Sequence, residues 1–312
     1  MKSYFQFYPV SFSWVAFSPK PKGIIVFIGG AFFGSLQTLF YNYLLKQLFL
    51  QGYTIIALPF HFTFRHWSVA LSLLREQQVL RHLIIGILKD SGFQYKDYEV
   101  YLENENYIWL GHSLGCKYIA LLEFLADWRI NPDGTRNLMK HCLNNSEEQI
   151  NDIEQQIQNI DISLKGQYSI LLAPEISDTE AAIRVPLLPK LIDSFGLGVQ
   201  PTQEQTFNLI ESSPLFNLTG MISFDKDSTI SGTKKDPVIR RKDGAIDSRT
   251  NTVPWLIEVQ PKIRMLHKEI QGRHLRPLGL QLGNKIFGAI AAPPENLVPT
   301  ILDLLSQLKA RH

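Results

Sequence analysis

Cysteine is scarce in this chain of 312 residues, since only Cys116 and Cys142 occur. Two cysteines cannot form the disulfide framework typical of small secreted domains, so we expect a reducing compartment and a cytoplasmic protein. Net charge is low as well, because 31 lysines and arginines are balanced by 29 aspartates and glutamates. Without a strong field of one sign, we expect no binding to nucleic acid and no general attraction to an anionic membrane.

Long apolar runs are also missing. The N-terminal residues alternate between apolar and polar, which is typical of a strand and unlike the apolar segment of a signal peptide. Residues 23–45 carry no charge, but glycines and polar side chains interrupt them, so we predict a strand, a turn and a helix here and no transmembrane segment. No Walker loop, dinucleotide glycine pattern or zinc-ligand spacing occurs, and we therefore expect no cofactor and no metal.

What the chain does contain is an alternation of apolar strands and amphipathic helices. Apolar residues make up 45% of the sequence, enough for a large core. The alternation predicts an α/β fold, with a mostly parallel central sheet and helices on both faces, in a single domain over residues 1–312. The predicted strands cover 23–28, 53–59, 107–110, 168–174, 218–224 and 263–268, after one or two antiparallel strands within 4–17. The predicted helices cover 36–50, 67–88, 114–126 and 297–308.

Two segments depart from this alternation. Residues 131–166 are rich in Asn, Gln and Glu with a narrow apolar stripe, which predicts an exposed helix with one edge on the body. Residues 179–216 read as helical but broken by prolines. We interpret both as a helical insertion or cap within the domain. Residues 228–253 are polar and predict a long loop.

Ser113 lies in the sequence Gly111-His112-Ser113-Leu114-Gly115, which matches the G-x-S-x-G nucleophile elbow. A predicted buried strand precedes it and a predicted helix follows, which is the context that the motif requires. The turn is so sharp that side chains beside the serine would clash, and Gly111 and Gly115 remove them. We predict that Ser113 is a nucleophile.

A serine nucleophile needs a general base, and the base needs an acid that orients it. In α/β-hydrolases the chain order is serine, acid, histidine. Asp227 follows the predicted strand that ends near residue 224 and is our choice of acid, with Asp225 as the rival. His274 follows a glycine after the last predicted strand and is our choice of base, whereas His267 lies within that strand and is expected to be structural.

Backbone N–H groups are expected to stabilise the oxyanion of an acyl-transfer reaction. One should belong to Leu114, the residue after the nucleophile. The other should come from the glycine turn after the first parallel strand, and we assign it to Ala31, with Phe32 as the alternative. Aromatic residues alternate within residues 60–67, and they either line an apolar acyl pocket or form core beneath a loop.

Two stretches resemble a known family. The elbow extended through Cys116 and Lys117, and the acid region over residues 224–230, are similar to a family of α/β-hydrolase-like proteins of cyanobacteria and plastids, domain of unknown function 1350. The resemblance covers most of the chain. It implies the α/β-hydrolase fold and a cyanobacterial-type cytoplasm or a plastid stroma, and it carries no established substrate.

These residues lead to two hypotheses about function. In the first, the protein is a serine hydrolase of a small carboxylic ester or thioester, with Ser113, Asp227 and His274 as the triad, and acyl transfer is a variant with another acceptor. In the second, the fold is a catalytically inactive scaffold that acts as a binding or assembly factor, with residues 131–166 as the surface for a protein partner. A serine that reacts with an activated probe separates the two.

Overall fold

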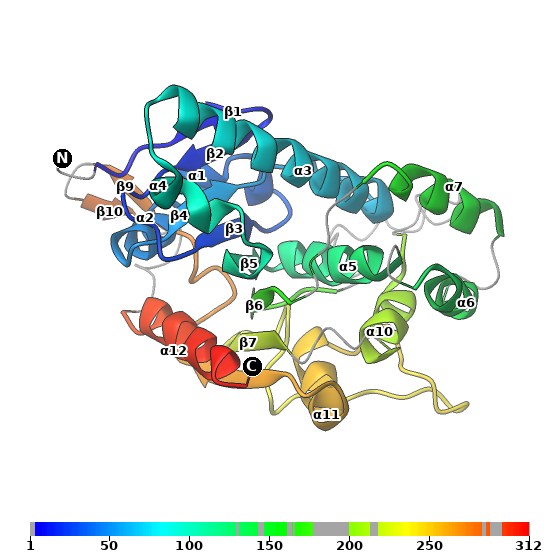
Figure 1. Cartoon of the computed structure of the whole chain (residues 1–312). Coiled ribbons are helices and arrows are strands. Elements are labelled where there is room, and N and C mark those ends of the chain that lie inside the picture. The colour runs from blue at the N-terminus through cyan, green and yellow to red at the C-terminus, as the bar shows by residue number, and fades with distance from the viewer. Residues whose placement is uncertain are drawn as a thin grey trace.

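The computed structural model describes residues 4–128, 131–142, 147–160, 164, 166–176, 200–212, 218–282, 285–287 and 295–311. Its centre is an eight-stranded sheet (Figure 1) with the order β1-β2-β4-β3-β5-β6-β7-β8. The strands are β1 (Tyr8–Val10), β2 (Ser13–Ala16), β3 (Ile24–Ile28), β4 (Thr54–Ala57), β5 (Tyr107–His112), β6 (Tyr168–Leu172), β7 (Thr219–Phe224) and β8 (Leu266–Ile270). From β4 to β8 every neighbouring pair is parallel, and the β1–β2 hairpin joins β4 antiparallel.

Helices cover both faces of the sheet, because alternate residues of each strand point to opposite sides. Ile25 and Phe27 of β3 pack with α2 (Asn42–Leu50) and α12 (Leu297–Lys309) in one core. Ile24 and Val26 of the same strand belong to a second core, together with α3 (His66–Asp90), α5 (Leu114–Trp128) and α11 (Thr252–Ile263). Strands that are buried on both faces read as continuous apolar runs, which is why the sequence revealed them.

Short elements fill the connections. They are η1 (Phe33–Ser35), α1 (Gln37–Phe40), α4 (Tyr95–Tyr98), η2 (Glu99–Tyr101), η3 (Asn104–Asn106) and a separate hairpin of β9 (Leu280–Leu282) and β10 (Lys285–Phe287). The uncharged stretch 23–45 resolves into β3, a turn, η1, α1 and the start of α2. Among the described residues, no helix has the length and apolar character needed to cross a membrane.

The segment 131–166 contains two helices where one was expected, α6 (Pro132–Cys142) and α7 (Glu147–Ile157). Ile150, Ile153 and Ile157 of α7 are buried, as the apolar stripe indicated, and α7 packs next to α3. Arg136 of α6 forms ion pairs with Glu147 and Glu154 of α7, which holds the two helices together. Figure 1 shows α6 and α7 on the side of the molecule away from α12.

Part of the second predicted insertion, 179–216, lies outside the described residues. Its described part contains α10 (Gln203–Ser212), which packs against α5, α6 and α11. The role of both segments as a cap stays a prediction. The loop predicted over 228–253 is present up to Asn251, but the following residues form α11, which the sequence analysis missed. Pro254 stands in the first turn of α11, where a missing N–H costs nothing, and Pro261 lies near its end.

Glu123 of α5 is a buried carboxyl group at the amino ends of two strands. Its Oε1 accepts hydrogen bonds from Ser169 Oγ at 2.7 Å and from Thr219 Oγ1 at 3.4 Å. Burial raises the pKa of Glu123 to about 7, because desolvation disfavours the charged form more than these two bonds favour it. Between about pH 4.5 and pH 7, the folded protein therefore holds a proton on Glu123 that the unfolded chain has already released.

This raised pKa predicts a pH-dependent stability. The contribution of the protonated Glu123 to the free energy of unfolding is fully present below the unfolded pKa of 4.5 and is lost as pH rises through about 7. We expect the free energy of unfolding of the native protein, relative to Glu123→Gln, to fall by on the order of 3 kcal/mol across this window. Urea denaturation of both proteins at about pH 5 and about pH 8 measures the difference. If the difference in unfolding free energy between the native protein and Glu123→Gln does not change with pH, the raised pKa of Glu123 is contradicted.

Candidate active site

Ser113 sits in a sharp turn between β5 and α5. Its φ of 55° lies in the left-handed region, which is costly for a residue with a side chain. Two glycines make the turn sterically possible. A Cβ on Gly115 would lie 2.2 Å from the carbonyl oxygen of Ile28, and a Cβ on Gly111 would lie 2.7 Å from Ile119 Cδ1. The turn therefore has the geometry that the G-x-S-x-G pattern predicted, and it is anchored by a hydrogen bond from Ser113 N–H to the Leu172 carbonyl at 3.0 Å.

His274 reaches this serine from the loop after β8. Its Nε2 lies 2.8 Å from Ser113 Oγ, although 161 residues separate the two in the chain. The loop is held by Asp225, whose Oδ1 accepts the N–H of Gly272 at 2.9 Å. His274 itself is only 6% exposed, so the imidazole is largely screened from bulk water.

Asp227 lies on the other side of the same imidazole. Its Oδ2 is 2.8 Å from His274 Nδ1, and the carboxylate is 2% exposed. Asp225 is exposed on the surface of the same turn and bonds to the backbone instead. Of the two candidate acids, the structure places Asp227 against the histidine.

These contacts fix how the protons are arranged. A carboxylate can only accept, so His274 Nδ1 carries the hydrogen and donates it to Asp227 Oδ2. In the neutral ring Nε2 is then an acceptor, and Ser113 donates its hydroxyl hydrogen to it. Within the described part of the chain Asp227 Oδ1 has no hydrogen-bond partner, so the carboxylate depends on His274 for the compensation of its buried charge.

The sequence analysis missed Ser231, which also contacts the histidine. Ser231 is fully buried and donates its hydroxyl hydrogen to the Ala173 carbonyl at 2.7 Å. Its Oγ lies 3.1 Å from His274 Nδ1, as a second acceptor beside Asp227. No motif marks such a serine. Only its position, four residues after the candidate acid Asp227, could have drawn attention to it.

The two residues proposed to supply the oxyanion amides lie at the same cavity as Ser113. Leu114 and Ala31 both line the cavity at Ser113. The N–H of Gly30, one residue earlier, is already used in a hydrogen bond of 2.8 Å to the hydroxyl of Tyr41. The alternative donor, Phe32, lines the cavity too, and its side chain is 70% exposed. The assignment of the oxyanion donors remains a proposal.

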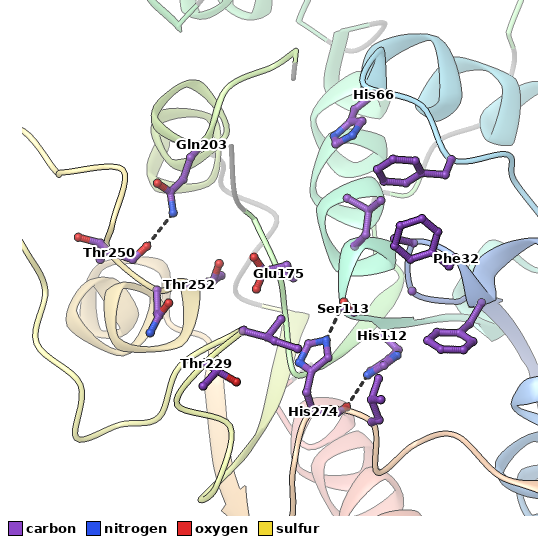
Figure 2. Close-up of a pocket in the computed structure, with 18 of the residues that line it drawn as sticks. Phe32, His66, His112, Ser113, Glu175, Gln203, Thr229, Thr250, Thr252 and His274 are labelled. Carbon is purple, nitrogen blue, oxygen red and sulfur yellow. Dashed lines mark hydrogen bonds between the residues drawn. The ribbon is translucent and has the colours of Figure 1, made fainter. Parts of the chain in front are cut away.

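A cavity of about 420 Å³ opens above Ser113. Figure 2 shows Phe32 and His66 on one side of it and Gln203, Thr250 and Thr252 on the other, with Ser113 and His274 between them. Phe62 belongs to the aromatic side as well, and its ring lies 5.1 Å from that of Phe32. The polar side is internally bonded, since Gln203 Nε2 donates to the Thr250 carbonyl at 2.7 Å.

Residues of the aromatic stretch 60–67 are found both in the wall of this cavity and in the core, so the two locations that the sequence left open are both occupied. Phe62 and His66 line the cavity, whereas Phe60 and Trp67 are buried in the core against α3 and α5 residues. Burial, and next the charge of Lys117, lower the pKa of His66 to about 2, so this wall stays neutral.

The remaining histidines near the site have other partners. His267 of β8 is bonded to Ser223 Oγ at 2.8 Å and does not contact Ser113, in agreement with a structural histidine. His112 is buried beside the serine and points away from it, toward Tyr41 and the backbone of His274. Among the residues that the structure describes, no group of three or more His, Cys, Asp or Glu side chains could hold a metal ion.

Comparison with known protein families shows which family this chain belongs to. The family model for proteins of unknown function DUF1350 matches residues 6–293. The chain belongs to the DUF1350 family. No curated protein sequence matches it well enough to indicate a relative.

Solved structures show which fold this DUF1350 member has. A candidate carboxylesterase from Lactobacillus plantarum superposes with a TM-score of 0.53 at 12% identity, over 100% of both chains. A sugar hydrolase from Lactococcus lactis gives a TM-score of 0.50 at 12% identity, over 98% of this chain and 97% of the other. Esterase B from Lactobacillus rhamnosis, with a tributyrin phosphonate, gives 0.50 at 12% identity over 96% and 80%. The DUF1350 chain therefore has the α/β-hydrolase fold, as the elbow and the alternation of strands and helices predicted.

Proposed function

We propose that this protein is a serine hydrolase that acts on a carboxylic ester or thioester of modest size. One observation carries the proposal: a buried hydrogen-bond relay runs from Ser113 Oγ through His274 to Asp227 at the floor of a cavity. The serine side chain is 9% exposed, and the cavity gives a small molecule access to it. Nucleophile, base and orienting acid within hydrogen-bond distance are the signature of covalent acyl transfer.

The proposed reaction follows from these positions. His274 Nε2 accepts the Ser113 proton while Oγ attacks the carbonyl carbon, and Asp227 stabilises the imidazolium that forms. The amides of Leu114 and Ala31 donate to the developing oxyanion. His274 then protonates the leaving alcohol or thiol, and water, activated by the same histidine, releases the acid from Ser113.

The residues that line the cavity favour a substrate whose acyl group binds there. Phe32 and Phe62 offer an apolar surface beside Ser113, which suits an aliphatic or aromatic acyl chain. A cavity of about 420 Å³ suits a small molecule. Structural neighbours that are esterases are consistent with such a substrate.

Labelling with a fluorophosphonate probe tests the proposal. We expect the native protein to be labelled, because the base makes Ser113 nucleophilic, and we expect Ser113→Ala to remain unlabelled. Ser248→Ala is the matched control, since it removes an exposed hydroxyl from the rim of the same cavity and should label like the native protein. Gel fluorescence over time gives the rates.

Absence of labelling in a folded native protein would overturn the hydrolase proposal. The inactive scaffold would then be the better hypothesis, with the paired helices α6 and α7 as the surface to test for a protein partner. Turnover of p-nitrophenyl esters of increasing chain length, by a protein that does label, would define the acyl group.

A further inference from the structure

A chain of buried hydrogen bonds runs from Gly30, through Tyr41 and His112, to the backbone of His274. The N–H of Gly30 donates to Tyr41 Oη at 2.8 Å, and Tyr41 Oη lies 2.8 Å from His112 Nδ1. His112 Nε2 in turn lies 2.9 Å from the carbonyl oxygen of His274 (Figure 2). We call Tyr41 and His112 together the Tyr41–His112 bridge. It connects the turn after β3 with the loop after β8.

The protons of the bridge have one consistent arrangement. The carbonyl of His274 can only accept, so His112 Nε2 carries a hydrogen. Burial, and next the repulsion that His274 would exert if both rings were protonated, lower the pKa of His112 to about 3, so the ring is neutral and its Nδ1 is an acceptor. Tyr41 therefore donates its hydroxyl hydrogen to His112, and it accepts from Gly30. Each of these three bonds has a donor and an acceptor.

The bridge is confined on every side. Tyr41 and His112 are 0% and 1% exposed. Tyr41 stands between α1 and α2 with its ring against Phe27 of β3, at 4.7 Å between ring centres. A Cβ on Gly30 would lie 3.3 Å from both His112 Nδ1 and Tyr41 Oη, and 3.2 Å from Ser113 Cβ. A glycine is thus the residue that lets the turn approach the bridge and the nucleophile this closely.

We propose that Tyr41 and His112 are positioning residues of the hydrolase. The bridge sets the separation between the turn that carries the Ala31 amide and the loop that carries His274, so that both face Ser113 at once. This inference rests on the proposed function. It assigns a role to the second residue of the elbow, and a displacement of about 1 Å in such a site costs on the order of 100-fold in rate.

Steady-state kinetics on a p-nitrophenyl ester test the bridge. Tyr41→Phe keeps the ring and removes the hydroxyl, and we expect kcat to fall about 10-fold with KM within about 3-fold. His112→Leu removes both bonds of the imidazole, and we expect kcat to fall about 100-fold. His112→Gln retains an N–H for the His274 carbonyl and should recover part of that loss. Because the residues act as one unit, the double variant Tyr41→Phe/His112→Leu should be no slower than His112→Leu alone.

The matched control is Tyr101→Phe. It also removes a buried tyrosine hydroxyl, one that is bonded to Thr54 Oγ1 at 2.7 Å at the amino end of β4, away from Ser113. We expect a loss of stability similar to that of Tyr41→Phe and a kcat within about 2-fold of native. If Tyr41→Phe and His112→Leu have the kcat of this control, the bridge has only a structural role and the inference is overturned.

A second readout does not need turnover. Nitrogen NMR of the imidazoles reports which nitrogen of His274 carries the hydrogen and at which pH the ring titrates. We expect native His274 to carry it on Nδ1, and Tyr41→Phe and His112→Leu to give a mixture of tautomers that Tyr101→Phe does not give. An inactive native protein with this change would overturn the proposed function and support the bridge. An inactive native protein whose His274 signals are unchanged in the variants would overturn both.

Discussion

Replacing Ser113 by alanine is expected to lower kcat for ester hydrolysis by at least about 10,000-fold. The hydroxyl oxygen is the atom that forms the acyl-enzyme, and His274 Nε2, 2.8 Å from that oxygen, is placed to accept the hydroxyl proton. His274→Ala should cause a loss of similar size, because without the base the serine is a poor nucleophile. The double variant should be no slower than either single variant, since the two side chains act as one unit. Steady-state and single-turnover rates with a p-nitrophenyl ester measure all three.

The control for this experiment is Ser248→Ala, at the rim of the same cavity, with an expected kcat within about 2-fold of native. Circular dichroism and urea denaturation check that each variant is folded. Ser113→Ala with more than about a hundredth of the native rate would mean that Ser113 is not the nucleophile. Losses that multiply in the double variant would mean that Ser113 and His274 act in separate steps.

Asp227→Asn is expected to lower kcat by about 1,000- to 10,000-fold while the fold is retained. The asparagine amide can donate to His274 Nδ1, which places the imidazole hydrogen on Nε2. In that tautomer Nε2 donates and can no longer accept the Ser113 proton at 2.8 Å. The loss therefore comes from the proton arrangement, and KM should change little. The rate against pH, measured for both proteins, separates this effect from a loss of binding.

Asp225→Asn is the matched control, because it makes the same chemical change two residues away. The Asp225 carboxylate accepts the N–H of Gly272 at 2.9 Å, and an asparagine carbonyl can accept it as well. We expect kcat within about 5-fold of native. A larger loss in Asp225→Asn than in Asp227→Asn would reverse the assignment of the acid, which the sequence alone left open between these two residues.

Much of the fold followed from the sequence because the strands β3 to β7 are buried on both faces and read as apolar runs. The elbow at Ser113 was visible because its glycines are required by close contacts, such as that of Gly115 with the carbonyl of Ile28. Helix α11 was not predicted, since Pro254 and Pro261 obscure its pattern. The split of 131–166 into α6 and α7 also escaped, because a polar segment gives little periodicity at its turn.

By itself, then, the sequence determined the order of the buried strands β3 to β7, the sharp turn at Ser113 and the candidates for acid and base. Those are local properties, set by apolar periodicity and by the steric demands of a few glycines. Only the tertiary structure decided that Asp227, and not Asp225, lies against His274, and that hydrogen bonds connect Ser231 and His112 to His274 and Tyr41 to His112. These contacts join residues 43 to 162 positions apart, and their distances depend on how the carboxyl ends of several parallel strands meet, which no local pattern encodes.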